Sequence, residues 1–369
     1  MSPLRARARV NVAAIERNVG RLRRELEAGS ELCAVVKADG YGHGALHAAR
    51  AALAGGAGWL AVATADEAAQ LRKGGIDARL LVLGALSPEE LDVALQARAD
   101  VVAWREPFVA AVAARGGGRV HVKLDTGMGR LGTRDPEEAT RVAQAAAADP
   151  SLELVGAMTH FATADERGDD FFGRQLGRFD AWARPLRERH AGLVLHAANS
   201  AGLLRDAASH YDLVRAGVAI YGLDPFQEDA RARDIEPALE LASYVAEIKP
   251  CAAGESAGYG RRFVARADTM IATVPIGYGD GISRALTNNA ELLVGARRFP
   301  LVGTVSMDNV TLDLGAGGGG VHVGDEALLI AAGLPAEEMA RRLDTINYEI
   351  TCSLTARVPR EHHRDGVPL

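Results

Sequence analysis

Short runs of apolar, often β-branched residues recur along about the first 220 residues and alternate with longer segments of helical period. The runs rarely alternate apolar with polar positions, which is typical of parallel strands covered on both faces. They predict eight strands, at Leu32–Ala38, Trp59–Ala63, Arg79–Gly84, Val101–Trp104, Val120–Leu124, Leu154–His160, Val194–Ala197 and Leu213–Ile220.

Segments of helical period between these runs predict helices, the clearest at Ala45–Leu53, Ala65–Lys73, Pro88–Ala97 and Pro136–Ala148. Ser87-Pro88 and Asp135-Pro136 are each followed by two glutamates, the pattern of an N-cap, a first-position proline and an acidic first turn. Eight strand–helix repeats predict an α/β fold with a (β/α)8 TIM barrel. The alternative is a doubly wound open sheet, which usually has fewer strands and does not close.

The pattern changes after Asp224-Pro225, where the polar stretch Gln227–Asp234 is interpreted as a linker. Strand-like runs broken by Gly and Pro then predict a smaller, mostly antiparallel β-domain with one helix at Ala336–Leu343. Its predicted strands are Tyr244–Lys249, Met270–Pro275, Leu292–Val294, Leu301–Val305, Val310–Leu314 and Ala327–Ile330. We therefore expect a barrel domain over 1–233 and a β-domain over 234–369, with about the first ten residues pairing with the second domain.

Composition narrows the class of protein. Apolar residues make up 48% and charged residues 24%, as in ordinary globular chains, and the formal charge of −6 disfavours a nucleic-acid partner. The best candidate for a membrane span, the uncharged run Ala51–Ala65, is too short to cross a membrane, and the N-terminus has no secretory pattern. Three widely spaced cysteines without a C-x-x-C motif favour reduced thiols and a cytoplasmic location.

Polar residues gather where the predicted barrel strands end, and barrel enzymes carry their chemistry at that edge. Several of them are cations, and no cluster of metal ligands, H-E-x-x-H or G-x-S-x-G motif accompanies them. These positions are Lys37, Lys123, Arg130, His160, Asn199, Ser200, Arg215 and Gly217.

Lys37 and Arg215 each allow two interpretations. Lys37 follows an apolar strand, and desolvation there would lower its pKa toward that of a nucleophilic amine able to form a Schiff base. Taken alone, it reads better as a surface lysine before a glycine turn. Arg215 lies within a strand, where its charge is either paired in a buried salt bridge or used in a site. An arginine that donates a hydrogen bond to a cofactor's pyridine nitrogen would keep that nitrogen unprotonated.

The loops offer two weaker signals. Arg130 stands on the glycine-rich turn Asp125–Arg130, and its guanidinium fork suits a substrate carboxylate as well as plain solvent. Gly217 and Val218 end the last strand, where barrels often hold phosphate on backbone N–H groups, with Ser200 as a further donor; alone, this is an ordinary tight turn.

Together these segments resemble the alanine racemases, two-domain enzymes that use pyridoxal phosphate (PLP), nearly from end to end. The matching segments are Ala34–Gly44, Lys123–Gly132, Thr159–Glu166, His196–Gly202, Val214–Gly222, Gly258–Arg261, Pro275–Gly281, Gly303–Asn309 and Ile346–Arg360.

The resemblance implies a homodimer that interconverts L- and D-alanine by a two-base proton transfer and supplies D-alanine for peptidoglycan. Lys37 would hold PLP as an aldimine and act as one base, and Tyr259 of the partner subunit would be the other. Lys123 would be carbamylated, as in many members, because a carbamate anion could orient Arg130, which binds the substrate carboxylate.

The remaining implied roles fall into two groups. Cofactor contacts would come from Tyr41, His160, Asn199, Ser200, Arg215, Gly217, Val218 and Tyr348. Substrate contacts or the access route would involve Met307, Tyr278 and Asp308, and no metal is implied.

Three alternatives stay open from the sequence. One is a racemase of different specificity, such as serine, because shape alone rejects one added hydroxyl poorly. Another is a PLP-dependent decarboxylase of related fold, although those enzymes place an acid where this chain has Arg215. The third is a PLP-binding carrier, a class that usually lacks the second domain.

Overall fold

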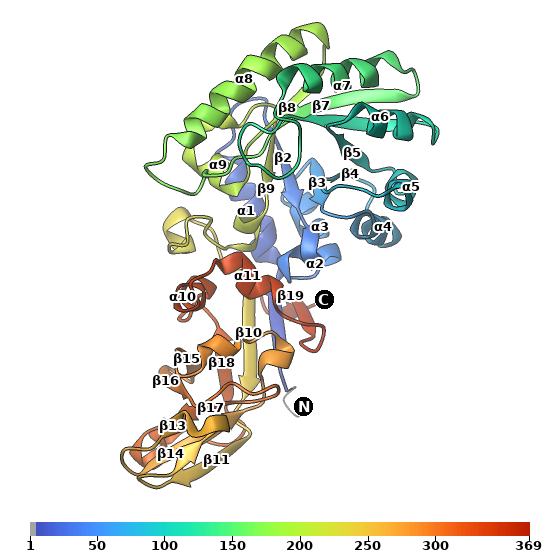
Figure 1. Cartoon of the computed structure of the whole chain (residues 1–369). Coiled ribbons are helices and arrows are strands. Elements are labelled where there is room, and N and C mark those ends of the chain that lie inside the picture. Colours follow the sequence, from blue (N-terminus) through green and yellow to red (C-terminus); the bar gives the residue numbers. More distant parts are fainter. Residues whose placement is uncertain (1–4) are drawn as a thin grey trace. The chain divides into compact units, whose positions relative to one another are not determined.

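The structure is a computed structural model that describes residues 5–369. Its contacts divide the chain into two compact units, which we describe separately. One unit is Ile15–Phe226, and the other combines the chain up to Ala14 with Gln227–Leu369 (Figure 1).

Ile15–Phe226 is built around eight parallel strands in the order β8-β7-β6-β5-β4-β3-β2-β9. Beyond the ladder, backbone hydrogen bonds from Asp212 to Leu195 (3.0 Å) and from Arg215 to Ala198 (2.9 Å) link β9 to the segment that begins with β8. The sheet is therefore a nearly closed barrel, which confirms the predicted fold class. Its strands are β2 (Glu31–Val35), β3 (Trp59–Val62), β4 (Arg79–Val82), β5 (Asp100–Ala103), β6 (Gly118–Lys123), β7 (Leu152–Met158), β8 (Val194–His196) and β9 (Leu213–Ala216).

Helices connect the barrel strands, and their N-termini form where the sequence predicts them. The Ser87 hydroxyl accepts from Glu90 N (3.2 Å) and the Asp135 carboxylate from Glu137 N (2.9 Å), which satisfies amide groups that have no partner within the helix. The helices are α1 (Val12–Arg23), α2 (Lys37–Tyr41), α3 (Ala45–Ala54), α4 (Ala65–Lys73), α5 (Pro88–Gln96), α6 (Glu106–Ala113), α7 (Pro136–Ala148), α8 (Phe171–Arg189), α9 (Ser200–Arg205), η1 (Ala207–Ser209) and η2 (Val218–Tyr221).

The second unit contains a ten-stranded sheet in the order β11-β14-β17-β16-β15-β18-β10-β1-β19-β20. All its pairs are antiparallel except β1 with β19, so this unit is the predicted mostly antiparallel domain. The strands are β1 (Arg7–Asn11), β10 (Leu239–Tyr244), β11 (Glu247–Cys251), β14 (Thr269–Val274), β15 (Ala290–Val294), β16 (Arg297–Val302), β17 (Val310–Asp313), β18 (Glu326–Ile330), β19 (Arg360–Arg364) and β20 (Val367–Pro368).

Short elements complete the β-domain. A separate hairpin pairs β12 (Ser256–Ala257) with β13 (Phe263–Val264). The helical segments are η3 (Ala230–Arg233), η4 (Tyr259–Arg261), η5 (Tyr278–Asp280), η6 (Arg284–Leu286), η7 (Ala316–Gly320), α10 (Ala336–Arg342) and α11 (Asn347–Cys352). No helix within residues 5–369 has the length and hydropathy needed to cross a membrane.

The structure corrects one predicted strand of this unit. Tyr244–Lys249 is the end of β10 and the start of β11, with a break at Val245 and Ala246. The chain changes partners there, because Val245 N donates to Asp325 O (2.8 Å) and Ala246 N to Thr273 O (2.8 Å). A run of β-forming residues cannot reveal such a change of neighbour.

The residues at the start of the second unit are hydrogen-bonded to its last helix. The Gln227 side chain accepts from Asn347 N (2.8 Å) and donates to Asn347 Oδ1 (3.0 Å). Gln227, the first residue of the stretch interpreted as a linker, is therefore held by α11.

Candidate active site

Lys37 stands at the start of a left-handed turn. The predicted strand ends earlier than expected, at Val35, and Lys37 is half-buried two residues further on. Ala38, Asp39, Gly40 and Tyr41 have φ angles of 51°, 51°, 63° and 53°. Left-handed backbone costs roughly 1–2 kcal/mol at each non-glycine position, and such strain persists only where the surroundings fix it.

Neighbouring elements fix this turn. The carboxylate of Glu67, which forms the capping box of α4 with Thr64, accepts from Ala38 N (2.5 Å). The Asp39 carboxylate accepts from Ala45 N at the start of α3 (2.9 Å). Asp39 O also accepts from Gly44 N (2.8 Å). The sequence therefore holds Lys37 at a rigid position above the strand ends.

Arg215 is buried in the barrel, with 2% of its surface exposed. Its Nη1 donates to His196 Nδ1 (2.9 Å), and its Nη2 donates to the carbonyls of Thr159 and Ala197 (2.9 Å each) and to His160 Nδ1 (3.3 Å). Nε makes no hydrogen bond to any residue of the described part of the chain. Arg215 is thus held by neutral acceptors and not in the salt bridge that the sequence allowed.

Lys123 and His160 lie in the same cationic cluster. Burial, and then the charges of Arg215 and Arg130, lowers the pKa of Lys123 to about 8. Burial followed by Arg215, Lys123, Arg130 and Lys37 holds the pKa of His160 well below its ordinary value. The charges of Lys37, Lys123, Arg130 and Arg215 thus all act on His160, and this local excess of positive charge favours an anionic ligand.

The turn that carries Arg130 is organised by Asp125. Burial would raise the pKa of Asp125, but hydrogen bonds from Gly129 N and Gly127 N (3.0 Å each) and from Arg134 hold it below its ordinary value. Arg130 follows directly and is exposed. Asp125 therefore fixes the loop, and its charge also acts on Lys123, where it opposes part of the lowering of the Lys123 pKa.

Gln175 on α8 joins two of the active-site loops. Its side chain donates to Thr126 Oγ1 and His160 O (3.1 Å each) and accepts from Ala162 N (2.8 Å). Thr126 Oγ1 also lies 2.8 Å from Thr159 Oγ1. We did not predict Gln175 or Asp125 as functional; a buried glutamine in an amphipathic helix was the available signal for the first.

Four residues predicted to hold phosphate meet beside β9. Ser200 Oγ accepts from Gly217 N (2.9 Å) and Ala219 N (3.3 Å). A Cβ added to Gly217 would lie 2.5 Å from the Tyr41 hydroxyl, so any larger residue there would displace the Tyr41 ring. Val218 begins η2 next to Gly217, and Asn199 caps α9 by accepting from Gly202 N (2.9 Å).

The other predicted residues belong to the β-domain unit. Tyr259, Met307 and Tyr278 have 74%, 51% and 42% of their surfaces exposed, which is unusual for large apolar side chains. Their loops contact one another, because Thr304 Oγ1 donates to Tyr259 O (2.7 Å) and Tyr278 N donates to Ser306 O (3.0 Å).

Asp308 and Tyr348 complete the β-domain set. The carboxylate of Asp308 receives a hydrogen bond from Arg357 Nη2 (2.5 Å), and Arg357 Nε lies 3.3 Å from the buried Asp280. Tyr348 is half-buried on α11. The structure thus brings the predicted residues together in two groups, one in each unit.

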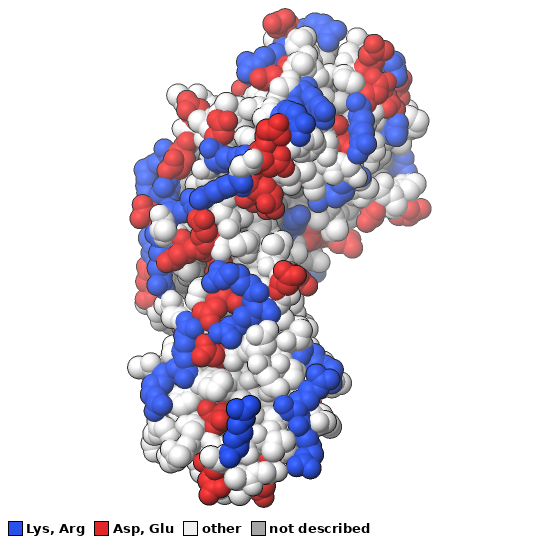
Figure 2. Space-filling view, turned by 60° about the vertical axis from the view of Figure 1, so that its left-hand side comes forward, with Lys and Arg blue, Asp and Glu red and all other residues white. Residues whose placement is uncertain are grey.

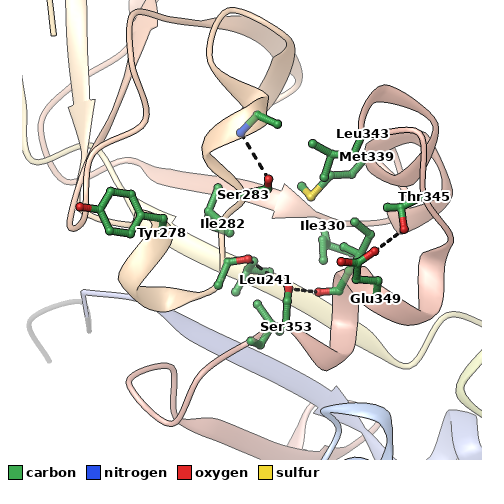
Figure 3. A pocket seen from close by; sticks show the side chains of 14 residues that line it. Leu241, Tyr278, Ile282, Ser283, Ile330, Met339, Leu343, Thr345, Glu349 and Ser353 are labelled. Carbon is green, nitrogen blue, oxygen red and sulfur yellow. Dashed lines mark hydrogen bonds between the residues drawn. The ribbon is translucent and has the colours of Figure 1, made fainter. Parts of the chain in front are cut away.

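A pocket of about 270 Å³ lies wholly within the β-domain unit, between Tyr278, β10, α10 and α11 (Figure 3). Most of its lining is apolar, including Leu241, Ile330 and Met339. Its carboxylate, Glu349, already accepts from the Thr345 hydroxyl. This pocket lacks the cations of the barrel site and does not suit an anionic substrate.

Figure 2 shows acidic and basic side chains interspersed over the one face in view. Within residues 5–369, no group of three or more His, Cys, Asp or Glu side chains is arranged to hold a metal ion.

Comparison with known proteins identifies the family. Residues 10–225 match the family profile "Alanine racemase, N-terminal domain", and residues 238–362 match "Alanine racemase, C-terminal domain". An alanine racemase of Symbiobacterium thermophilum is 40% identical over 369 residues, with 96% of each chain covered. The chain belongs to the alanine racemase family.

Solved structures of the family have the same fold. The alanine racemase from D-cycloserine-producing Streptomyces lavendulae matches with a TM-score of 0.92 at 34% identity, covering 98% of both chains. The enzyme from Bacillus anthracis, crystallised with bound L-Ala-P, matches with a TM-score of 0.90 at 35% identity, covering 99% of this chain and 96% of the other. The family likeness therefore covers both units.

Proposed function

We propose that this protein interconverts L-alanine and D-alanine with pyridoxal phosphate, as the family name implies. The observation that carries the proposal is Arg215, a buried cation held by neutral acceptors at the centre of a cationic site. An amino acid and a phosphorylated cofactor both bring negative charge, which an excess of cations attracts.

The barrel residues fit pyridoxal phosphate. None of the described residues accepts a hydrogen bond from Arg215 Nε–H, so this group can donate to a pyridine nitrogen. Tyr41, Ser200 and the backbone of Gly217 and Val218 would hold the phosphate, and the space that Gly217 leaves beside Tyr41 supports this. Asn199 would support that loop, and we propose that Tyr348 adds a phosphate contact.

Each residue then has a definite task. When bound, the cofactor supplies an electron-withdrawing system that stabilises negative charge on the substrate α-carbon. Arg215 keeps its own proton and so leaves the ring nitrogen unprotonated, which limits side reactions. Arg130 would orient the substrate carboxylate with its guanidinium fork, aided by the backbone of Met307 of the partner subunit. His160 would pack beside the ring and support Arg215.

Inversion by one base would require that base to carry the proton to the opposite face of the α-carbon, whereas a base on each face needs no such movement. Lys37 would act on one face. We propose that Tyr259 of the partner subunit acts on the other, with Tyr278 and Asp308 lining the access route. The exposure of Tyr259, Met307 and Tyr278 supports a homodimer with shared sites, and a monomeric active species in sedimentation would contradict it.

Incubation of the protein and cofactor with L-alanine should abolish the optical rotation, and D-alanine should reach the same end point. An unchanged rotation with the cofactor bound would reject alanine as substrate. Relative kcat/KM on alanine and serine decides between those two substrates, and carbon dioxide release would indicate a decarboxylase. The cytoplasmic location expected from the cysteines stays a prediction.

Substitution of Arg130 is expected to weaken alanine binding. Arg130→Gln should raise KM by roughly 10–100-fold, because a charge-assisted hydrogen bond contributes about 1.5–3 kcal/mol. Arg130→Lys should recover part of the loss, since it keeps the charge without the fork. Arg141→Gln, an exposed arginine on α7, is the control. Steady-state kinetics that show equal KM values in all four proteins would reject this role.

We propose that Lys123 is carbamylated. Its amine, with a pKa of about 8, is partly neutral at physiological pH and can attack carbon dioxide, forming a C–N bond and releasing a proton. The product is an anion between Arg130 and Arg215, where a cationic lysine is disfavoured. It would orient Arg130.

Carbamylation of Lys123 predicts a pH-dependent signal. In 13C-labelled bicarbonate, one carbamate resonance should appear and grow as pH rises through about 8, because only the neutral amine reacts. The resonance should be absent in Lys123→Arg and present in Lys73→Arg, an exposed lysine on α4. A spectrum identical for wild type and Lys123→Arg would contradict the proposal.

A further inference from the structure

A chain of four buried polar side chains runs through the barrel interior below the active site. Asp100, His121 and His196 have none of their surface exposed, and Arg215 has 2%. Asp100 Oδ2 lies 3.2 Å from His121 Nε2, His121 Nδ1 lies 2.9 Å from His196 Nε2, and His196 Nδ1 lies 2.9 Å from Arg215 Nη1. Asp100 and His121 have no part in the reaction proposed above.

The donors and acceptors of these four side chains permit one arrangement of protons. Arg215 can only donate, so His196 Nδ1 accepts and His196 carries its proton on Nε2. That proton is donated to His121 Nδ1, which places the His121 proton on Nε2, where Asp100 accepts it. Both histidines are then neutral, consistent with burial lowering the pKa of each, and with Arg215 adding to that effect for His196.

The backbone is shaped to bring these rings together. His121 lies on β6 and His196 on β8, with β7 between them. A register shift in β7 places Gly156 opposite His121, and a Cβ at Gly156 would come within 2.4 Å of His121 Nδ1. The missing side chain therefore opens the path across β7, and the two rings meet edge-on at 5.0 Å between centroids.

The far end of the chain is anchored at the strand starts. Asp100 pairs with Arg79 (3.2 Å) and with Arg119, both about one-third exposed. Burial would raise the pKa of Asp100, but His121 and Arg119 hold it below its ordinary value, so it stays an acceptor. Arg79 also stacks on Trp59, 4.0 Å from guanidinium carbon to ring centroid, and Trp59 meets His121 edge-on.

We propose that Asp100, His121 and His196 are positioning residues that fix the plane of the Arg215 guanidinium, so that its Nε–H is presented to the cofactor ring. This inference rests on the proposed function through the role of Arg215. The hydrogen-bond chain itself is a property of the barrel and can be measured separately from catalysis.

The first test is the histidine tautomers in the holoenzyme. Long-range 1H–15N spectra of 15N-histidine-labelled protein should show His121 and His196 as neutral rings protonated on Nε2. Assignment uses the His121→Gln and His196→Gln variants. A proton on Nδ1 of either ring, or a doubly protonated ring, would overturn the proposed hydrogen-bond arrangement even if the protein racemises alanine. Conversely, an inactive wild-type protein with these tautomers would overturn the proposed function alone.

The second test is a matched pair of variants. In His121→Asn the amide oxygen replaces Nδ1 and still accepts from His196, whereas in His121→Gln the amide replaces Nε2 and that acceptor is lost. His121→Gln should lower kcat about tenfold with KM for alanine within twofold, and should leave His196 in mixed tautomers. His121→Asn should stay within about threefold of wild type with His196 unchanged.

Controls separate positioning from packing. His210→Gln and His210→Asn remove a buried histidine that is not one of the four hydrogen-bonded side chains. His210 is hydrogen-bonded to Leu203 O and Glu27 N, and neither substitution should change the His196 signal. Gly156→Ala should reproduce His121→Gln without removing any polar group. Equal effects of His121→Asn and His121→Gln would overturn the proposal, and if neither folds, the wild-type tautomers decide it.

Discussion

Lys37→Ala is expected to lower the racemisation rate by roughly 10⁴-fold or more, because it removes both a base and the amine that attaches the cofactor. The left-handed turn that holds Lys37 is fixed by backbone contacts to Glu67 and Asp39, so the loss should be chemical and not structural. The measurement is the initial rate of rotation loss, with cofactor attachment read from absorbance before and after borohydride.

The control is Lys73→Ala, which removes an exposed lysine of the same unit. It should match wild type, and borohydride should trap the cofactor on both wild type and the control but not on Lys37→Ala. A Lys37→Ala protein that keeps a tenth of the rate, or that is labelled by borohydride at another lysine, would contradict the assignment.

Tyr259→Phe is expected to lower the rate of inversion by roughly 10²–10⁴-fold, the usual contribution of a general acid or base. L- and D-alanine have equal free energies, so kcat/KM must fall equally in both directions. The two enantiomers should differ in α-hydrogen exchange. One enantiomer should still exchange its α-hydrogen with deuterium oxide through Lys37 and keep its configuration. The other should not exchange.

Two further experiments test whether the effect is specific to Tyr259 and whether the site is shared between subunits. Tyr244→Phe, on β10, removes a hydroxyl of the same unit and should behave as wild type. Mixed dimers of Lys37→Ala and Tyr259→Phe chains should recover up to about a quarter of wild-type activity, because half the dimers are hybrids and each hybrid has one intact site. Recovery of nothing would contradict a site shared between subunits.

The barrel was predictable because its signals are local. The Ser87 and Asp135 caps and the apolar strand runs depend on neighbouring residues in the chain, and both caps appear where predicted. All eight strands lie on the predicted runs, but they end before those runs do, for example β2, β7 and β9 at Val35, Met158 and Ala216. Lys37 was predicted at the edge of the barrel where the strands end, because it directly follows an apolar run. Its left-handed turn was not predicted, because Ala38 and Asp39 adopt positive φ angles only where α3 and α4 hold them.

The supporting residues depend on contacts that sequence spacing does not show. His121 and His196 are 75 positions apart and meet only because β7 has a glycine and a register shift between them. Gln175 connects two loops from a helix whose pattern indicates only its buried face. In each case a polar residue at a buried position was the visible signal, and its partner was the missing information.

Transfer of hydrogen during the first turnovers tests the central claim most directly. Wild-type protein with its cofactor is mixed with L-alanine in deuterium oxide, and the early D-alanine is isolated and analysed for deuterium at the α-carbon. Two bases on opposite faces predict D-alanine that is deuterated from the first turnover, since the second base delivers a solvent-derived proton. D-alanine that retains the substrate hydrogen would contradict the two-base account, and absence of D-alanine would contradict the proposed function.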